Sequence, residues 1–590
     1  MVYRAHVLVC GNPRCVEKGA REVEAALHEK LNELDLEDEV EVMEVSTLGL
    51  DDEGPEIVIY PDGTHYVHLT PEDAGHIVEE HLLKGRVVED LLYREPPSEK
   101  LPPPSAKEVR VVLDNVGKID PLSIEDYIAH DGYLALAQVL TETSPDEVIA
   151  EIKQSGLRGR GGAGFPTWLK WSFARKARGE TKYVICNADE GDPGAFMNRR
   201  VLEGDPHSVI EGMIIAAYAI GARRGYIYVR AEYPIAVNTL RVALDQAREY
   251  GLLGEKLFGT DFDFDLEIRM GAGAFVCGEE TALMASIEGK RGMPQTRPPY
   301  PAVSGLWGKP TNINNVETYA NVPQILRKGA EWFASMGTEN SKGTKTFAIA
   351  GKVKRTGLIE VPFGMTIREI VYDVGGGILN DRAFKAVQTG GPMGGCIPEQ
   401  YLDLPVDYES LSEVGSMMGS GGFVVMDEDT CMVDIARFFM EFTQDESCGK
   451  CVPCRVGTRR MLEILNRICE GEGRPGDIEK LEELSEYIID GSLCGLGKGA
   501  PNPVVSTLQY FRDEYEAHVY DKTCPAKVCK ALIEYKIDPE ACIGCTRCAR
   551  NCPVSCISGE PRKAHVIDES ACIRCGVCQQ VCPVDAVRVE

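Results

Sequence analysis

Long hydrophobic runs are missing from this chain of 590 residues. Its best apolar stretch, residues 213–220, is far shorter than the roughly 20 residues that a helix needs to cross a bilayer. Positive charge is also scarce, since 63 lysines and arginines face 92 aspartates and glutamates, for a formal net charge of −29. Nucleic-acid binding requires a basic face, so this balance argues against it and suits docking to protein partners. We therefore expect neither a membrane-spanning protein nor a nucleic-acid-binding one.

Cysteine, in contrast, is abundant, and 12 of the 22 cysteines fall into three runs. Near the C-terminal end, a run of four cysteines closed by Pro553 is repeated by a second run closed by Pro583. Bacterial ferredoxins hold two [4Fe–4S] clusters with this spacing, and the fourth cysteine of each run ligates the other cluster. The predicted ligand sets are Cys542, Cys545, Cys548 and Cys582 for one cluster, and Cys572, Cys575, Cys578 and Cys552 for the other. Two complete runs argue against a metal-free disulfide module, so we expect the chain to transfer single electrons.

A third run predicts a further cluster. Cys448, Cys451 and Cys454 are each separated by two residues, and Cys494 lies forty residues further on. Three close thiolates and a distant fourth supply the ligands of a [4Fe–4S] cluster. A structural zinc site with four thiolates is the alternative; the neighbouring ferredoxin motif favours the cluster.

The compartment follows from these cysteines and from the N-terminus. Residues 1–4 lead into a strand-like pattern without the organisation of a signal peptide. Clusters ligated by thiolates favour a reducing compartment over a disulfide-forming one. We expect a cytoplasmic protein.

The chain is too long for one core, and changes in pattern divide it into five predicted domains. In residues 1–98, predicted strands alternate with predicted helices. The strands lie near 5–9, 39–45 and 56–60, and one helix starts at Thr70 and Pro71. A linker rich in proline covers residues 95–105. Residues 106–340 are a large α/β block, 343–425 are rich in strands and Gly-Gly pairs, 428–520 are helical, and 521–590 hold the ferredoxin motif.

A glycine-rich segment at residues 155–166 is the first sign of a phosphate-bearing ligand. Glycine lets backbone N–H groups approach a phosphate closely, although such a loop alone is as often a simple turn. Polar groups follow predicted strands at residues 187–190, 278–281 and 312–318. Ligands of α/β proteins bind where strands end, and amides suit a neutral heterocycle better than a metal.

From Asp114 to about Cys494, these motifs closely resemble the NADH-binding flavoprotein subunit of respiratory complex I. With residues 1–98 and the ferredoxin motif added, the whole chain resembles the NADH-binding β subunit of soluble, electron-bifurcating hydrogenases and related formate dehydrogenases. The resemblance implies a multidomain α/β and α+β protein. Its domains would be a thioredoxin-like domain, a Rossmann-like domain for FMN and NADH, a β-grasp (SLBB) domain, a helical bundle with one [4Fe–4S] cluster, and a ferredoxin domain with two.

The resemblance also assigns binding residues, position by position. Those matching the FMN-binding positions are Gly159, Gly161, Gly162, Lys170, Asn187, Asp189, Glu190, Gly278, Glu279, Asn314, Asn315 and Thr318. Those matching the NADH-contacting positions are Phe165, Phe173, Glu280, Arg297 and Tyr300.

Three departures from complex I bear on function. Arg297 and Tyr300 stand where complex I usually has lysine and phenylalanine, which keeps the charge and the aromatic ring. Asp192 replaces a glutamate and resembles the hydrogenase branch. Glu280 near the dinucleotide would repel a 2′-phosphate, so we expect NAD rather than NADP.

The resemblance implies that NADH would stack on FMN and transfer a hydride, and that electrons would leave singly to the cluster predicted at Cys448, Cys451, Cys454 and Cys494. No side chain is expected to act as an acid or base; Glu190 either tunes the flavin or makes ordinary hydrogen bonds. The implied partners are a thioredoxin-like [2Fe–2S] small subunit, a ferredoxin and a terminal hydrogenase or formate dehydrogenase subunit, with electron bifurcation as the sharper hypothesis. A non-bifurcating diaphorase subunit and a passive electron carrier without dinucleotide binding are the alternatives.

The N-terminal domain departs most from its family. A thioredoxin-like [2Fe–2S] domain uses two cysteine pairs, and Cys10 and Cys15 match the first. Residues 46–55 run through the place of the second pair without sulfur. Two ligands do not hold such a cluster unaided, so a structural or docking domain is favoured over a cluster.

A zinc site is predicted ahead of the ferredoxin motif. Cys469, His518, Cys524 and Cys529 offer three thiolates and an imidazole, enough for a closed tetrahedral site that would pin the ferredoxin arm to the helical bundle. Free thiols and a surface histidine are the equally weighted alternative. The remaining cysteines have no ligand pattern and are expected to be small buried hydrophobes: Cys186, Cys277, Cys396, Cys431 and Cys556.

Overall fold

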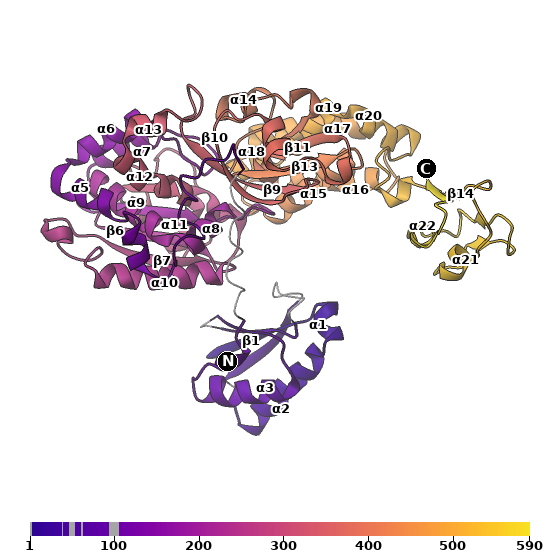
Figure 1. Cartoon of the computed structure of the whole chain (residues 1–590), viewed down its shortest axis with the longest axis horizontal. Helices are drawn as coiled ribbons and strands as arrows, with labels where there is room; N and C mark the ends of the chain where they lie inside the picture. Colours follow the sequence, from indigo (N-terminus) through magenta and orange to yellow (C-terminus); the bar gives the residue numbers. More distant parts are fainter. Residues whose placement is uncertain (1–2, 38, 46–53, 61–62, 94–104) are drawn as a thin grey trace. The chain divides into compact units, whose positions relative to one another are not determined.

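The computed structural model describes residues 3–37, 39–45, 54–60, 63–93 and 105–590, and it divides into two compact units, Met1–Lys100 and Leu101–Glu590 (Figure 1). The predicted linker lies outside the described residues except for Ser105. Within the described ranges, no helix combines the length and apolarity needed to cross a membrane.

The first unit is a four-stranded sheet in the order β2-β1-β3-β4. β1 pairs in parallel with β2 and antiparallel with β3, and β3 pairs antiparallel with β4. The strands are β1 (Ala5–Cys10), β2 (Val40–Val45), β3 (Ile57–Tyr60) and β4 (Thr64–Tyr66). The first three were predicted from the sequence, and β4 was not. The apolar faces of α2 (Ala20–Glu33) and α3 (Pro71–Ile77) share one core with this sheet. Thr70 caps α3 reciprocally with Asp73, which confirms the predicted helix start.

The second unit begins with a parallel four-stranded sheet in the order β7-β6-β5-β8. Its strands are β5 (Tyr183–Ala188), β6 (Arg224–Arg230), β7 (Asp265–Gly271) and β8 (Thr311–Asn315). The helices that contact it include α7 (Thr167–Lys176), α9 (Pro206–Ile220), α10 (Pro234–Glu249) and α12 (Val316–Lys328). Almost every residue of α9 is buried, because the helix is apolar on all sides.

A mixed five-stranded sheet follows, in the order β10-β9-β13-β11-β12. Its strands are β9 (Thr344–Gly351), β10 (Gly357–Pro362), β11 (Phe384–Thr389), β12 (Cys396–Pro398) and β13 (Gly422–Asp427). Only the β9–β13 pairing is parallel among these described strands. The predicted strand-rich block is thus confirmed, with its own apolar core.

Helices then dominate up to residue 521. The principal ones are α15 (Met432–Asp445), α16 (Thr458–Cys469), α17 (Asp477–Gly491) and α19 (Asn502–Tyr510), which share a core. The C-terminal module repeats a short helix, α21 (Arg547–Asn551) or α22 (Val577–Gln580), within each cysteine run. Two small antiparallel ribbons complete it, β14 (Tyr535–Ile537) with β17 (Val587–Val589) and β15 (Ile557–Ser558) with β16 (Val566–Ile567).

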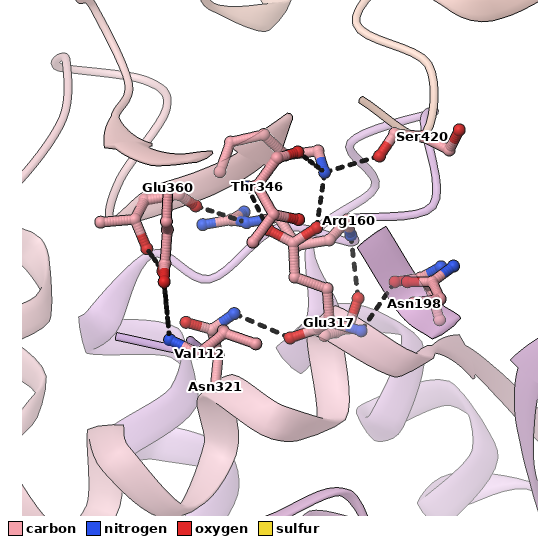
Figure 2. A network of polar contacts seen from close by, with 12 residues as sticks. Val112, Arg160, Asn198, Glu317, Asn321, Thr346, Glu360 and Ser420 are labelled. Atoms are coloured by element: carbon pink, nitrogen blue, oxygen red, sulfur yellow. Dashed lines mark hydrogen bonds and ion pairs between the residues drawn. The ribbon is translucent and has the colours of Figure 1, made fainter. Parts of the chain in front are cut away.

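Buried charges join the mixed sheet to the helices around the parallel sheet (Figure 2). Lys345 on β9 pairs with Glu317 on α12 at 2.5 Å, and both side chains are almost inaccessible to water. The second oxygen of Glu317 accepts the backbone N–H of Thr346 at 2.9 Å. Glu360 on β10 accepts the backbone N–H groups of residues 111–113. Because an unpaired buried charge is costly, these contacts fix how the segments pack.

Replacing Lys345 with methionine should destabilise this junction by about 3–5 kcal/mol, because Glu317 is left as a buried charge without its cation. The double variant Lys345→Met/Glu317→Gln should recover most of that loss. Hydrogen exchange of the β9 amides measures the local free energy of opening. Lys354→Met is the control, since Lys354 pairs with Asp381 at the surface; equal protection in Lys345→Met and Lys354→Met would contradict the assignment.

Candidate functional site

The glycine-rich loop connects α6 (Pro145–Ser155) to α7, and its shape depends on close backbone approach. A Cβ on Gly162, whose φ is +121°, would lie 3.1 Å from the backbone of Gly419. A Cβ on Gly164, at φ +62°, would lie 2.7 Å from the ring of Tyr408. Larger residues therefore do not fit at these two positions.

Arg160 anchors this loop from inside the protein. Its fully buried guanidinium donates to the carbonyls of Thr344 at 3.0 Å, Arg158 at 2.8 Å and Lys342 at 2.7 Å. Its backbone N–H donates to the hydroxyl of Thr318 at 2.8 Å. Thr318, predicted to contact FMN, thus holds the loop that carries three other predicted FMN residues. No local sequence pattern identified Arg160 as an anchor.

The other predicted FMN residues gather at one edge of the parallel sheet. β5 and β8 are paired so that Asn187 lies opposite Asn315, and both strands end at this edge. The Asn187 amide donates to the carbonyl of Gly278 at 2.8 Å, which brings the start of α11 (Glu280–Ile287) to the same place. The carboxyl ends of parallel strands are where α/β proteins bind ligands.

Ion pairs connect the predicted FMN and NADH residues. Lys170 on α7 contacts Glu280, and Arg297 contacts Glu279 and, at 3.3 Å, Glu280. Burial of Glu280 opposes ionisation, but Lys170 and Arg297 outweigh it, so the pKa of Glu280 is lowered. The sequence placed these residues in two sets, and the structure joins them in one charged group.

Two buried carboxyls near the end of β5 have raised pKa values. Burial raises the pKa of Asp189 to about 7, and the pKa of Glu190 to about 7. Glu190 accepts the backbone N–H groups of Asn198 and Arg199 and so caps α8 (Met197–Gly204). The Oδ2 atom of Asp189 is buried and, among the described residues, has no hydrogen-bond partner. A buried polar atom of this kind fits a site completed by a polar ligand, as FMN would be.

Three predicted NADH-contacting side chains are aromatic and exposed. Phe165, Phe173 and Tyr300 are 46%, 49% and 59% accessible. Phe173 lies three residues after Lys170 on α7, so the two share a helix face. Exposed rings beside a charged group are suited to stacking on a planar heterocycle.

The third cysteine run packs against the same sheet. Cys448, Cys451, Cys454 and Cys494 share an apolar cluster with Ile185 and Ile313 of the parallel sheet. Glu446 accepts the backbone N–H of Phe275 at 2.9 Å, which holds the cysteine loop near the start of α11. In the described part of the chain, the groups of three or more ligand atoms that lie within 4.8 Å of one another do not include these thiols.

The ferredoxin module brings the eight predicted ligands together in two small cavities. Cys542, Cys545, Cys548 and Cys582 line one cavity. Cys552, Cys572, Cys575 and Cys578 line the other. Cys556, predicted to be a buried hydrophobe, also lines the second cavity, and its sulfur lies 3.4 Å from that of Cys552. Each cavity is therefore lined by the four cysteines that the spacing groups together.

The structure brings together a further group of side chains of the types that bind metals, and one member differs from the predicted set. Cys431, His518, Cys524 and Cys529 are all buried, with ligand atoms within 4.8 Å of one another. The predicted fourth ligand, Cys469 at the end of α16, is not in this group. Cys431, predicted to be a simple hydrophobe, takes the place of Cys469 in the group. It directly precedes α15, and its Sγ lies 3.4 Å from Nε2 of His518. His518 Nδ1 lies 2.7 Å from the carbonyl oxygen of Glu514, which orients the ring.

In the N-terminal unit, the structure brings Cys10 and Cys15 together in a buried cluster. The sequence predicts that residues 46–55, which contain no sulfur, run through the place of the second cysteine pair. Of these, residues 46–53 lie outside the described residues.

Four protein families match successive segments of the chain. These are the Nuo51 FMN-binding domain at residues 152–324, the SLBB domain at 346–397, the NADH-ubiquinone oxidoreductase-F iron-sulfur binding region at 434–518 and a 4Fe-4S dicluster domain at 535–589. The chain is thus a mixed α/β multidomain protein that contains all four.

Curated relatives and a solved structure agree with these family matches. The HndC subunit of the NADP-reducing hydrogenase of Solidesulfovibrio fructosivorans is 60% identical over 459 residues, covering 78% of this chain and 93% of HndC. The F subunit of the NADH-quinone oxidoreductase of Escherichia coli (strain K12) is 45% identical over 401 residues, covering 68% of this chain and 90% of its own length. A crystal structure of NAD+-reducing [NiFe]-hydrogenase in the H2-reduced state matches with a TM-score of 0.65 and 31% identity, over 88% of this chain and 85% of that one.

These matches confirm the resemblance seen in the motifs. The chain belongs to the family that contains the F subunit of NADH-quinone oxidoreductase and the hydrogenase protein HndC, and it is an FMN and iron–sulfur oxidoreductase module.

Proposed function

We propose that this chain is the NADH:acceptor subunit of a multisubunit oxidoreductase of the electron-bifurcating hydrogenase type. FMN would bind at the carboxyl edge of the parallel sheet, and three [4Fe–4S] clusters would carry electrons to or from a ferredoxin and a terminal catalytic subunit. The observation that carries the proposal is the joining of the predicted FMN residues, NADH residues and third cysteine run at one edge of the sheet.

A bound flavin exchanges a hydride with a nicotinamide and single electrons with metal centres. The residues of this chain supply position and charge. Gly159, Gly161 and Gly162 let backbone N–H groups face a phosphate, and the amides of Asn187 and Asn314 offer hydrogen bonds to a ring edge. Phe165 and Tyr300 are exposed for stacking on the dinucleotide. The closeness of the cysteine loop to the start of α11 shortens the path for electrons.

The charged group at residues 279–297 bears on the choice between NAD and NADP. Glu280 was expected to repel a 2′-phosphate, but its carboxylate is paired with Lys170 and Arg297. Two carboxylates, Glu279 and Glu280, thus face two cations. The net repulsion of a 2′-phosphate is therefore weaker than the sequence implied. The name of the HndC relative includes NADP, whereas that of the Escherichia coli relative includes NADH. We propose NAD(H), because carboxylates suit the free ribose hydroxyl of NAD.

The other subunits of the proposed complex are those that the family resemblance implies. Its partners would be a thioredoxin-like [2Fe–2S] small subunit, a ferredoxin and a hydrogenase or formate dehydrogenase subunit, in the cytoplasm. The five domain boundaries, at 1–98, 106–340, 343–425, 428–520 and 521–590, are part of this proposal. A thioredoxin-like fold for the first domain and a β-grasp fold for the third belong to it too.

We also propose a structural zinc ion at Cys431, His518, Cys524 and Cys529. Three thiolates and an imidazole whose other nitrogen faces a carbonyl form a closed tetrahedral set. Cys431 begins α15, and Cys524 and Cys529 lie in the segment that leads to the ferredoxin module. The ion would fasten that segment to the helical bundle.

The proposed activity is tested by anaerobic titration of the reconstituted chain. NADH should bleach the flavin absorbance and reduce the clusters, and it should react at least about tenfold faster than NADPH, because the carboxylates of Glu279 and Glu280 can accept a hydrogen bond from a free ribose hydroxyl but not from a 2′-phosphate. Glu280→Gln should bring the reaction rates with NADH and NADPH closer together. Clusters that accept electrons from dithionite but not from either nucleotide would show a passive carrier, and a preference of the wild type for NADPH would contradict the NAD assignment.

The raised pKa of Asp189 predicts a pH dependence of FMN binding. With a pKa of about 7, the carboxyl is neutral below pH 7 and becomes anionic above it. Since FMN is itself an anion, its affinity should fall severalfold between pH 6 and 8, by Coulomb repulsion in a buried site. Fluorescence titration of flavin-free protein measures this. Asp189→Asn should flatten the dependence, and the exposed control Asp146→Asn should retain it; parallel curves for wild type and Asp189→Asn would refute the explanation.

Zinc content distinguishes the ligand set of the structure from that of the sequence. Cys431→Ser should lower the zinc content by about one equivalent per chain, because a closed site loses a thiolate. Cys469→Ser, the matched control, should leave it unchanged. Elemental analysis after removal of loosely bound metal is the measurement, and the reverse pattern would restore Cys469 as the ligand.

A further inference from the structure

The N-terminal unit contains a second compact group of metal-ligating side chains. The ligand atoms of Cys10, Cys15 and Glu56 lie within 4.8 Å of one another, and all three residues are buried. We propose that these three residues bind a single zinc ion, in place of the [2Fe–2S] cluster that the family resemblance implies for this domain.

Strand register explains why the three side chains meet. β1 and β3 are antiparallel with Val9 opposite Ile57, and the Cys10 N–H donates to the Glu56 carbonyl at 3.2 Å, so Cys10 lies opposite Glu56. Val9 and Ile57 face the apolar core, and side chains alternate along a strand. Cys10 and Glu56 therefore share the other face of the sheet.

Cys15 closes the group from a different element. It lies on the short helix α1 (Pro13–Glu17), and its Sγ is 4.0 Å from Oε1 of Glu56. The backbone passes close to this thiol, since a Cβ on Gly54 would lie 2.5 Å from the sulfur. The thiol is thus enclosed on one side by Gly54 and on another by the carboxylate.

His65 is hydrogen-bonded to the carboxylate of Glu56. β4 is paired with β3 so that His65 lies opposite Val58, which puts it on the same sheet face as Glu56. Its Nε2 is 2.7 Å from Oε2 of Glu56, whereas Oε1 is the oxygen nearer the Cys15 thiol. Carboxylates that bind metals are commonly held by a second residue in this way.

The donor set favours one ion over a [2Fe–2S] cluster. The cluster requires four ligands, and residues 46–55, where the second cysteine pair would lie, contain no sulfur. Zinc binds thiolates at about 2.3 Å and carboxylates at about 2.0–2.2 Å, so its ligands lie within about 4.6 Å of one another, close to the spacing found here. Zinc also binds such sites more tightly than ferrous iron. Zinc sites with three protein ligands commonly take water as the fourth ligand.

The first test is the zinc content of the full-length chain, purified without oxygen and treated with a mild chelator. Cys15→Ser and Glu56→Gln should each lower it by about one equivalent, because each removes a ligand. Cys396→Ser is the matched control, since Cys396 is a buried cysteine outside the two ligand groups found among the described residues. Unchanged zinc in both Cys15→Ser and Glu56→Gln, or a loss of iron in place of zinc, would overturn the proposal.

A second measurement leaves the N-terminal unit intact, so it does not depend on whether its variants fold. In Cys524→Ser/Cys529→Ser, the other proposed zinc site is removed, and the remaining zinc should lie in the N-terminal unit. Zinc X-ray absorption should then show about two sulfur neighbours near 2.3 Å and about two oxygen neighbours near 2.0–2.2 Å. Absence of zinc from this double variant, or zinc with four sulfur neighbours, would contradict the Cys10, Cys15 and Glu56 site.

Discussion

The buried guanidinium of Arg160 is the contact on which the candidate flavin site depends. It donates to the carbonyls of Arg158, Lys342 and Thr344, and so ties the glycine-rich loop to the start of β9. The ion pair of Lys345 and Glu317 reinforces the same junction. Since buried charges are tolerated only when fully paired, the loop is held in one shape against the sheet edge. Its glycines then present backbone N–H groups without the loop having to reorganise when a ligand binds.

From that edge, side-chain packing continues to the third cysteine run. The cysteine loop at residues 448–454 packs against Ile185 and Ile313 of the parallel sheet. Glu446 and Lys450 contact the segments that precede and follow α11. The predicted flavin residues and the third cysteine run therefore lie against the same parallel sheet. Further along the chain, the Cys431 group connects helix α15 to the segment that enters the ferredoxin module.

The sequence was sufficient wherever spacing alone specifies chemistry. The repeat of the two runs led us to group Cys582 with the first run, and the structure places it in one cavity with those cysteines. The sequence did not place Cys431 in the group with His518, because the two residues are 87 positions apart and a buried thiol resembles any small apolar residue. Arg160, Lys345 and Glu56 were missed for a related reason. Burial of a charge depends on tertiary packing, which no local pattern reveals; Glu56 is visible only once β1 and β3 are paired.

The FMN affinity of an Arg160→Lys variant tests most directly whether the Arg160 contacts create the flavin cradle. Lysine keeps the charge but lacks the planar set of donors that reaches three carbonyls. Flavin-free Arg160→Lys, still folded by hydrogen exchange of the parallel sheet, should bind FMN at least about tenfold more weakly than the wild type. Equal FMN affinity in the two proteins would contradict the role given to Arg160.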